Sequence, residues 1–98
     1  MSPDEIREII FPAMAQQQTV TVMYQHKTDG RITMHKVVPY SVDAGKRSKS
    51  KKEMFWSFCV DHQHIEQRIP ENVLSITPDQ SDATFAYNEA PLFDSSNS

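Results

Sequence analysis

The sequence has few of the residues on which several classes of protein depend. Its 98 residues include one cysteine, Cys59, which excludes an internal disulfide framework and makes a reducing cytoplasm the expected compartment. It has two glycines, Gly30 and Gly45, so the glycine-rich loop that cradles phosphates in many nucleotide-binding proteins is absent. No segment approaches the ~20 apolar residues of a membrane span, and the acidic start MSPDEIREII is unlike a secretory signal. We therefore expect a cytoplasmic protein with no membrane contact.

Positive charge is scarce except at one place. The formal net charge is -3, and residues 78–98 contain acidic side chains but no lysine or arginine. The basic loop is the segment in which cations crowd together, and its members are Lys46, Arg47, Lys49, Lys51 and Lys52. We expect one local positive pole on an otherwise acidic surface, and such local fields steer ligands more than the net charge does.

Hydrophobic periodicity predicts one helix followed by five strands. A serine cap, an early proline and apolar residues at helical spacing predict a helix over residues 3–16, bent near Pro12. The predicted strands cover residues 19–27, 31–38, 53–61, 64–69 and 73–77. The predicted class is α+β, mainly β, with a five-stranded, strongly bent antiparallel sheet or small barrel after the helix. Residues 1–77 form the predicted domain, and residues 78–98 an acidic tail that is either flexible or extended along the domain.

The third predicted strand, EMFWSFCVD, carries apolar residues on both faces. Side chains alternate along a strand, so Met54, Trp56 and Phe58 share one side, while Phe55 and Ser57 share the other. Because the first set is wholly apolar, it is predicted to face the core. Phe55 is then the predicted exposed aromatic of this strand.

The order of these pieces resembles the WYL domain of bacterial regulators over about residues 3–77. The resemblance lies in the helix that leads to VTVMY, in the VVPYSV segment, in the aromatic strand FWSFCVD and in the closing RIPENVLSI. The Trp-Tyr-Leu triplet that names the family is matched here by Phe55, Trp56 and Ser57. The resemblance implies an Sm-like or SH3-like barrel preceded by a helix.

The family's arginines are partly replaced in this chain. His35 stands four residues before the proline of the second segment, where the family usually has arginine. Near the end, Arg68 and Asn72 stand at positions where family members tend to carry arginines. The resemblance implies a ligand-sensing module that recognises nucleic acid or nucleotides and signals to a separate effector protein, without catalysis. Because no helix-turn-helix segment is expected ahead of the domain, unlike in the family's transcription factors, we expect a standalone module.

The basic loop makes single-stranded nucleic acid or a nucleotide the predicted ligand. Lysine and arginine neutralise phosphates, and an exposed aromatic side chain stacks on an unpaired base. The predicted phosphate contacts are the basic loop together with His35, Lys36 and Arg68, and the predicted stacking residue is Tyr40 or Phe55. His35 would donate to phosphate when protonated, which would strengthen binding at mildly acidic pH. The alternative is that the loop is only a hairpin tip kept soluble by its charge.

Metal binding and catalysis find little support in the sequence. The segment CVDHQH places Cys59, Asp61, His62 and His64 within six residues. This spacing matches no zinc finger, and a tight turn is not expected to aim all four groups inward. Cys59 has no assignable base to activate it as a nucleophile. We therefore predict no metal site, no cofactor and no catalytic residue.

A second hypothesis makes the chain a protein-interaction adaptor. An exposed strand edge of a small sheet can accept a strand from a partner protein or from a second copy of the chain. Three aromatic residues of the tail, Phe85, Tyr87 and Phe93, would contact that partner. A homodimer joined along a strand is the simplest form of this hypothesis.

Overall fold

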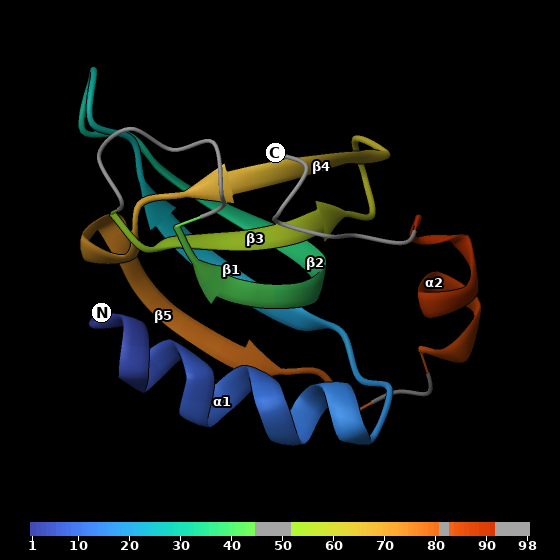
Figure 1. Cartoon of the computed structure of the whole chain (residues 1–98). Coiled ribbons are helices and arrows are strands. Elements are labelled where there is room, and N and C mark those ends of the chain that lie inside the picture. Colours follow the sequence, from blue (N-terminus) through green and yellow to red (C-terminus); the bar gives the residue numbers. More distant parts are fainter. Residues whose placement is uncertain (45–51, 81–82, 92–98) are drawn as a thin grey trace.

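A computed structural model describes residues 1–44, 52–80 and 83–91 of the chain. It contains one N-terminal helix and a five-stranded antiparallel sheet, which confirms the predicted mainly β, α+β class (Figure 1). The elements are α1 (Pro3–Ala15), β1 (Val20–Gln25), β2 (Ile32–Asp43), β3 (Met54–Cys59), β4 (His64–Arg68), the 3-10 helix η1 (Pro70–Asn72), β5 (Val73–Pro78) and α2 (Thr84–Glu89).

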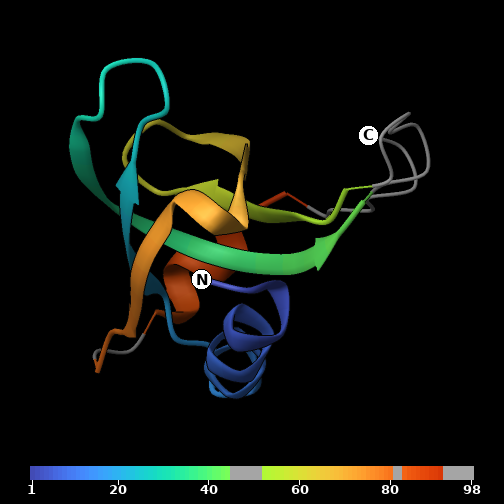
Figure 2. The same ribbon diagram turned by 90° about the vertical axis from the view of Figure 1, so that its left-hand side faces the viewer.

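The strand order is β4-β3-β2-β1-β5, and every neighbouring pair is antiparallel. β4 and β5 form the two edges, so the sheet is bent without being closed, and the predicted barrel is not confirmed. The long strand β2 pairs with β1 through its first half and with β3 through its second half. The register between β2 and β3 shifts between Pro39 and Ser41, where proline supplies no backbone N–H for the ladder. Figure 2 shows the resulting curvature of the sheet around α1.

Helix α1 begins as the sequence predicts. The Ser2 hydroxyl accepts a hydrogen bond from the Glu5 backbone N–H, and the Glu5 carboxylate accepts one from the Ser2 N–H, which together form a capping box. The helix continues through Pro12 and ends at Ala15, within the predicted boundaries.

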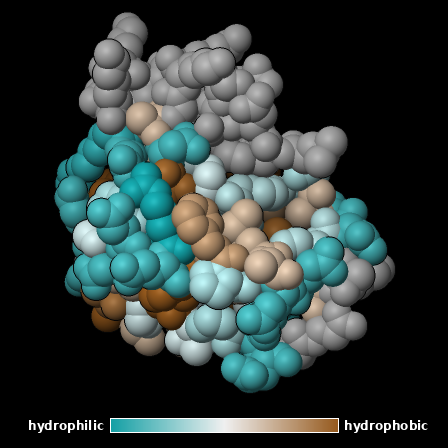
Figure 3. All heavy atoms as spheres, turned by 60° about the horizontal axis from the view of Figure 1, so that its bottom comes forward, coloured by the Kyte–Doolittle hydropathy of each residue, from teal (hydrophilic) through white to brown (hydrophobic). Residues whose placement is uncertain are grey.

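The hydrophobic core lies between α1 and the face of the sheet that α1 packs against, which we call the inner face. Ile6, Ile10 and Ala13 are the fully buried side chains of the helix. They belong to one cluster with apolar residues from the inner face, such as Val22 and Phe55. Seen from the side of α1, the surface mixes hydrophilic and hydrophobic areas (Figure 3).

The predicted facing of the third strand is wrong. Phe55, Ser57 and Cys59 are the fully buried residues of β3, each with 0% exposure, whereas Trp56 is partly exposed. Both faces of β3 carry apolar side chains, and Phe58 is also buried, so apolar content alone selects the wrong face. Phe55 lies in the core and cannot stack on a ligand.

The C-terminal segment contains structure that the sequence pattern does not predict. Asp79 accepts hydrogen bonds from the hydroxyls of Thr19 and Thr21, which fix the chain directly after β5. In α2, the Tyr87 hydroxyl donates to the Gln18 carbonyl over 2.7 Å and holds this helix against the turn before β1.

Among the described residues, no helix is both long and apolar enough to cross a membrane.

Candidate functional site

The inner face changes from apolar to polar beyond the area that α1 covers. Directly paired residues of an antiparallel sheet point to the same side. His35 pairs with Val22, and Arg68 pairs with Phe55, so both polar side chains share the face of the core. Polar residues at positions where a sheet pattern calls for core side chains indicate a functional site.

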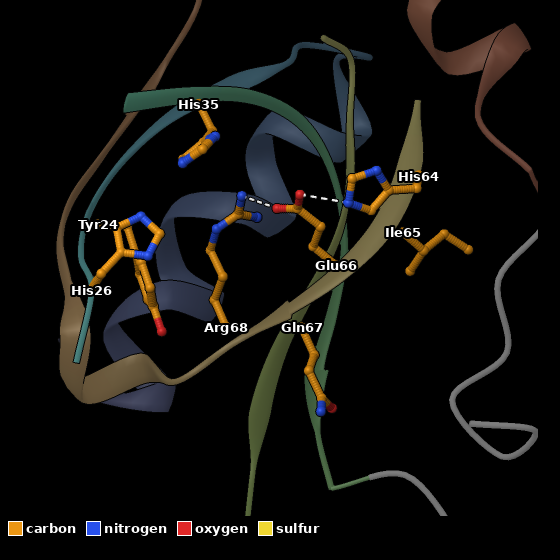
Figure 4. A pocket seen from close by; sticks show the side chains of 8 residues that line it. All are labelled: Tyr24, His26, His35, His64, Ile65, Glu66, Gln67 and Arg68. Atoms are coloured by element: carbon orange, nitrogen blue, oxygen red, sulfur yellow. Dashed lines mark hydrogen bonds and ion pairs between the residues drawn. The ribbon is translucent and has the colours of Figure 1, made fainter. Parts of the chain in front are cut away.

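An open pocket occupies this polar part of the inner face, which Figure 4 shows from close by. Its volume is about 430 Å³, within the range of small-molecule sites, roughly 300–1,000 Å³. The lining residues are Tyr24, His26, His35, His64, Ile65, Glu66, Gln67 and Arg68. Glu66 and Arg68 of β4 point into the shared space, and the alternate residues Ile65 and Gln67 point away from it (Figure 4).

Arg68 is the one strongly buried charge of the pocket among the described residues, with 4% exposure. Its Nη1 donates to Ser57 Oγ over 3.0 Å, and its Nη2 forms an ion pair with Glu66. The guanidinium carbon lies 5.9 Å from the centre of the Tyr24 ring, in reach of a cation–π contact. These partners offset the cost of burying the charge, since an unpaired buried cation is strongly unfavourable. The predicted phosphate contact at Arg68 is therefore in the pocket, with Glu66 beside it.

Glu66 links Arg68 to the histidines. Its Oε1 lies 2.8 Å from His64 Nε2, while its other oxygen contacts Arg68 (Figure 4). Arg68 and Glu66 carry opposite charges, so this pair adds no net charge to the pocket.

The four histidines of the chain form a row of neighbouring rings. Thr33 Oγ1 lies 2.8 Å from Nε2 of His26 and 2.8 Å from Nε2 of His35, which joins the first two. The ring centres of His35 and His62 are 6.2 Å apart, and those of His62 and His64 are 5.8 Å apart. Residues that the sequence spreads over three segments thus meet on the inner face.

Burial lowers the pKa of His35 below its usual value, and the charge of Arg68 lowers the pKa further. His35 is accordingly a neutral imidazole at pH 7. The predicted strengthening of phosphate binding by His35 protonation would then require a lower pH than an exposed histidine would.

A tight turn after β3 folds His62 back onto Cys59. The Gln63 N–H donates to the Cys59 carbonyl over 2.8 Å, and Gln63 adopts a left-handed φ of 59°. Cys59 Sγ consequently lies 3.2 Å from His62 Nδ1. His35 joins this pair from β2, and the three ligand atoms all lie within 4.8 Å of one another. Of the four groups that the sequence places near this turn, Cys59 and His62 belong to this set, whereas Asp61 and His64 lie outside it, and the third member, His35, comes from another strand.

Among the other predicted phosphate contacts, neither Lys36 nor Lys52 lines the pocket. Lys36 follows His35 on β2 and so points to the opposite face. Lys52 is exposed and forms an ion pair with Glu71 over 3.4 Å. The rest of the basic loop, namely Lys46, Arg47, Lys49 and Lys51, lies outside the described residues. The loop joins the end of β2 at Asp43 to the start of β3, and this end of β2 is the one far from His35.

Tyr40, the second predicted stacking residue, contacts the C-terminal segment. Its hydroxyl donates to the Pro91 carbonyl over 2.8 Å. Burial raises the pKa of Tyr40 to about 12. The aromatic side chain in the pocket is instead Tyr24.

Sequence reasoning missed most of the pocket. It did not select Tyr24, His26, His64 or Glu66, although the alternation in HIEQR puts His64, Glu66 and Arg68 on one face of a strand. The alternation in HIEQR shows that these residues share a face, but the sequence does not show that this face becomes the inner face of the sheet.

Comparisons with known proteins give no relative: no protein-family model matches the chain, and neither a curated protein nor a solved structure does.

Proposed function

We propose that the chain is a non-enzymatic, WYL-like ligand-binding module that recognises a nucleotide or the end of a single-stranded nucleic acid in the inner-face pocket. A helix followed by five antiparallel strands agrees with the order that the WYL resemblance implies, in which a helix precedes an Sm-like or SH3-like barrel. The single observation that carries the proposal is the buried Arg68 guanidinium in an open pocket lined by imidazole rings.

Arg68 supplies the donors that a phosphate requires. A guanidinium has five N–H groups, and Ser57 and Glu66 engage two of its nitrogens. The remaining N–H groups can donate to phosphate oxygens, and such charge-assisted hydrogen bonds are stronger than neutral ones. The pairing with Glu66 keeps the fork in place before the ligand arrives, which lowers the entropic cost of binding.

The rings around Arg68 provide surfaces for a base. Tyr24 and His26 pack edge to face with ring centres 5.4 Å apart. Base–aromatic stacking contributes about 1–3 kcal/mol per base and tolerates different bases. A volume of about 430 Å³ lies in the range of small-molecule sites, which suits one nucleotide. In this proposal the basic loop contacts the following phosphates of a longer strand, and the occupied module acts on a separate effector protein.

Two variants with the same charge change test this assignment. Arg68→Gln removes one positive charge from the pocket, and Lys36→Gln removes one from the opposite face of β2. We expect Arg68→Gln to weaken binding of a nucleoside diphosphate roughly 10–100-fold, because charge-assisted hydrogen bonds to phosphate disappear. Lys36→Gln should leave the affinity within about twofold. Isothermal titration calorimetry measures both, after circular dichroism confirms the fold. Equal affinities of folded Arg68→Gln and the unaltered protein would contradict the proposal.

A loop variant separates the pocket from the basic loop. Replacing Lys46, Arg47, Lys49 and Lys51 by alanine should flatten the salt dependence of oligonucleotide binding, by about one unit of slope for each phosphate that these side chains neutralise. Binding of a single nucleotide should persist, because the groups that bind it lie in the pocket. A variant that no longer binds a mononucleotide would instead place the site on the loop.

A second candidate function is a homodimer joined along an edge of the sheet. β4 is an edge strand, and its outward-facing Ile65 is 37% exposed. Edges of this kind pair readily with a second strand. The tail aromatics support this proposal less, because Tyr87 is hydrogen-bonded within its own chain. Analytical ultracentrifugation tests it: a dimer that Ile65→Lys converts to a monomer supports edge pairing, and a monomer at high concentration contradicts it.

A further inference from the structure

We propose that Cys59, His35 and His62 form a binding site for a borderline-soft divalent metal ion, with Zn²⁺ as the natural occupant. The three residues come from the end of β3, from β2 and from the turn between β3 and β4. The site would form one wall of the inner-face pocket, because His35 lines that pocket.

The three ligand atoms are already close to the arrangement that a shared ion needs. Zn–S distances of about 2.3 Å and Zn–N distances of about 2.0–2.1 Å place neighbouring ligand atoms of a tetrahedral site roughly 3.3–3.6 Å apart. Cys59 Sγ and His62 Nδ1 are 3.2 Å apart, and all three atoms lie within 4.8 Å of one another. A side-chain movement on the order of 1 Å would bring the third atom into range.

The chemistry of the three groups matches zinc. One thiolate and two neutral imidazoles are ligands that Zn²⁺ prefers over carboxylate-binding ions such as Mg²⁺. The Thr33 hydroxyl engages Nε2 of His35, and metal-ligating histidines are commonly oriented through their second nitrogen in this way. His62 is exposed and so provides a route for the ion from solvent. Three protein ligands leave a fourth position for water or for a donor atom of a ligand in the pocket.

A catalytic Cys–His pair is the competing interpretation of the short Sγ–Nδ1 distance. A reactive cysteine is partly exposed, so that a substrate can reach the sulfur. Cys59 has 0% exposure and packs within the hydrophobic core cluster. A small ion that enters beside His62 needs far less space than a substrate, so metal binding is the use that this geometry favours.

The test uses the full chain in its reduced, chelator-treated form and titrates it with Co²⁺, a spectroscopic substitute for Zn²⁺. We expect saturation at one ion per chain, a sulfur-to-cobalt charge-transfer band and the intense visible absorption of a four-coordinate site. Zn²⁺ should then displace Co²⁺ and raise the melting temperature of the protein. A spectrum without the charge-transfer band would overturn the proposal, as would binding that does not saturate at one ion.

Variants in the same turn supply matched controls. His62→Ala changes an exposed residue and should reduce Zn²⁺ affinity by more than the ~10–100-fold that removal of an outer hydrogen-bond partner of a ligand costs. Cys59→Ser should abolish the charge-transfer band. Asp61→Asn, in the same turn but outside the group, should leave both unchanged. If Cys59→Ser fails to fold because the residue is buried, His62→Ala and Asp61→Asn still decide the matter. Equal affinities of these two variants would refute the site.

The metal site stands independently of the proposed nucleotide site. Arg68→Gln should lose nucleotide affinity and keep the Co²⁺ spectrum, whereas His62→Ala should lose the metal and keep nucleotide binding in metal-free buffer. The two proposals can thus fail separately.

Discussion

At the scale of single residues, Arg68 occupies a position where the sheet pattern would place an apolar side chain. Its backbone pairs with Phe55 in the core, yet its guanidinium is buried with Ser57 and Glu66 as partners. A buried charge is retained at such a position only when its partners are in place, because removal of one partner leaves an uncompensated charge. In the proposed function, stability and ligand binding therefore depend on the same ion pair.

Glu66→Gln should destabilise the protein by about 1.5–3 kcal/mol, the contribution of a hydrogen bond to a charged group. The substitution leaves Arg68 buried without its anionic partner. Urea unfolding followed by circular dichroism measures the change. The matched control is Glu71→Gln, which breaks the exposed ion pair with Lys52. That change should cost less than about 1 kcal/mol. Equal destabilisation in the two variants would show that Arg68 is not held by Glu66.

A substitution of Phe55 tests whether this face of β3 packs in the core. Phe55→Ala removes a fully buried aromatic ring and should lower the free energy of unfolding by about 3–5 kcal/mol. Denaturant unfolding measures this decrease. A decrease under about 1 kcal/mol, typical of surface positions, would indicate that Phe55 lies on the exposed face, as the sequence predicts.

At the scale of elements, α1 and the existence of five strands were predictable from the sequence, whereas the facing and the register of the strands were not. The capping residues and helical spacing predicted α1 to within one residue at its end. β3 carries apolar side chains on both faces, since Phe55 and Phe58 are both buried. Its sequence pattern alone therefore does not show which face packs against the core. Helix α2 is six residues long and has no side-chain cap, so it left no signal in the sequence.

The site was less predictable than the fold, because it depends on which strands become neighbours. The sequence indicates Arg68 and His35 as ligand-binding residues, and the structure brings both into the pocket. It indicates Lys36 as well, but alternation along β2 sends Lys36 to the opposite face. The local spacing of Cys59 and His62 argues against a metal site, because the third group, His35, comes from a strand that this spacing cannot reveal.

The docking of α2 should weaken at high pH. Burial raises the pKa of Tyr87 from about 10 to about 12, and its hydroxyl donates to the Gln18 carbonyl. A pKa raised by folding means that the protonated phenol stabilises the folded state fully below pH 10, and that this stabilisation disappears as the pH rises from 10 to about 12.

Alkaline titration followed by tyrosinate absorbance measures this effect. Tyr87→Phe should remove one component that ionises near pH 12 and make the free energy of unfolding less dependent on pH in that range. Tyr40, whose pKa burial also raises to about 12, remains as the internal comparison. If the component lost in Tyr87→Phe ionises instead at about pH 10, the usual value for an exposed tyrosine, the phenol is not held against Gln18.

At the scale of the whole molecule, one bent sheet serves two purposes. The half of its inner face under α1 holds the hydrophobic core, and the uncovered half holds polar side chains around a pocket. A small domain buries a smaller fraction of its surface than a large one, so each apolar position on the inner face matters for stability. The placement of imidazole, guanidinium and carboxylate groups on an inner face is therefore a cost to stability that the proposed binding function would explain.

The measurement that tests the central claim most directly is a nuclear magnetic resonance titration of the chain with a nucleoside diphosphate in chelator-treated buffer, with backbone amide signals and the side-chain signals of histidine, arginine and lysine recorded. Shifts concentrated on His26, His35, His64 and Arg68, with little change at Lys36, are the expected result. Shifts confined to the basic loop between Lys46 and Lys52, or no shifts at saturating nucleotide, would contradict the claim that the inner-face pocket is the binding site.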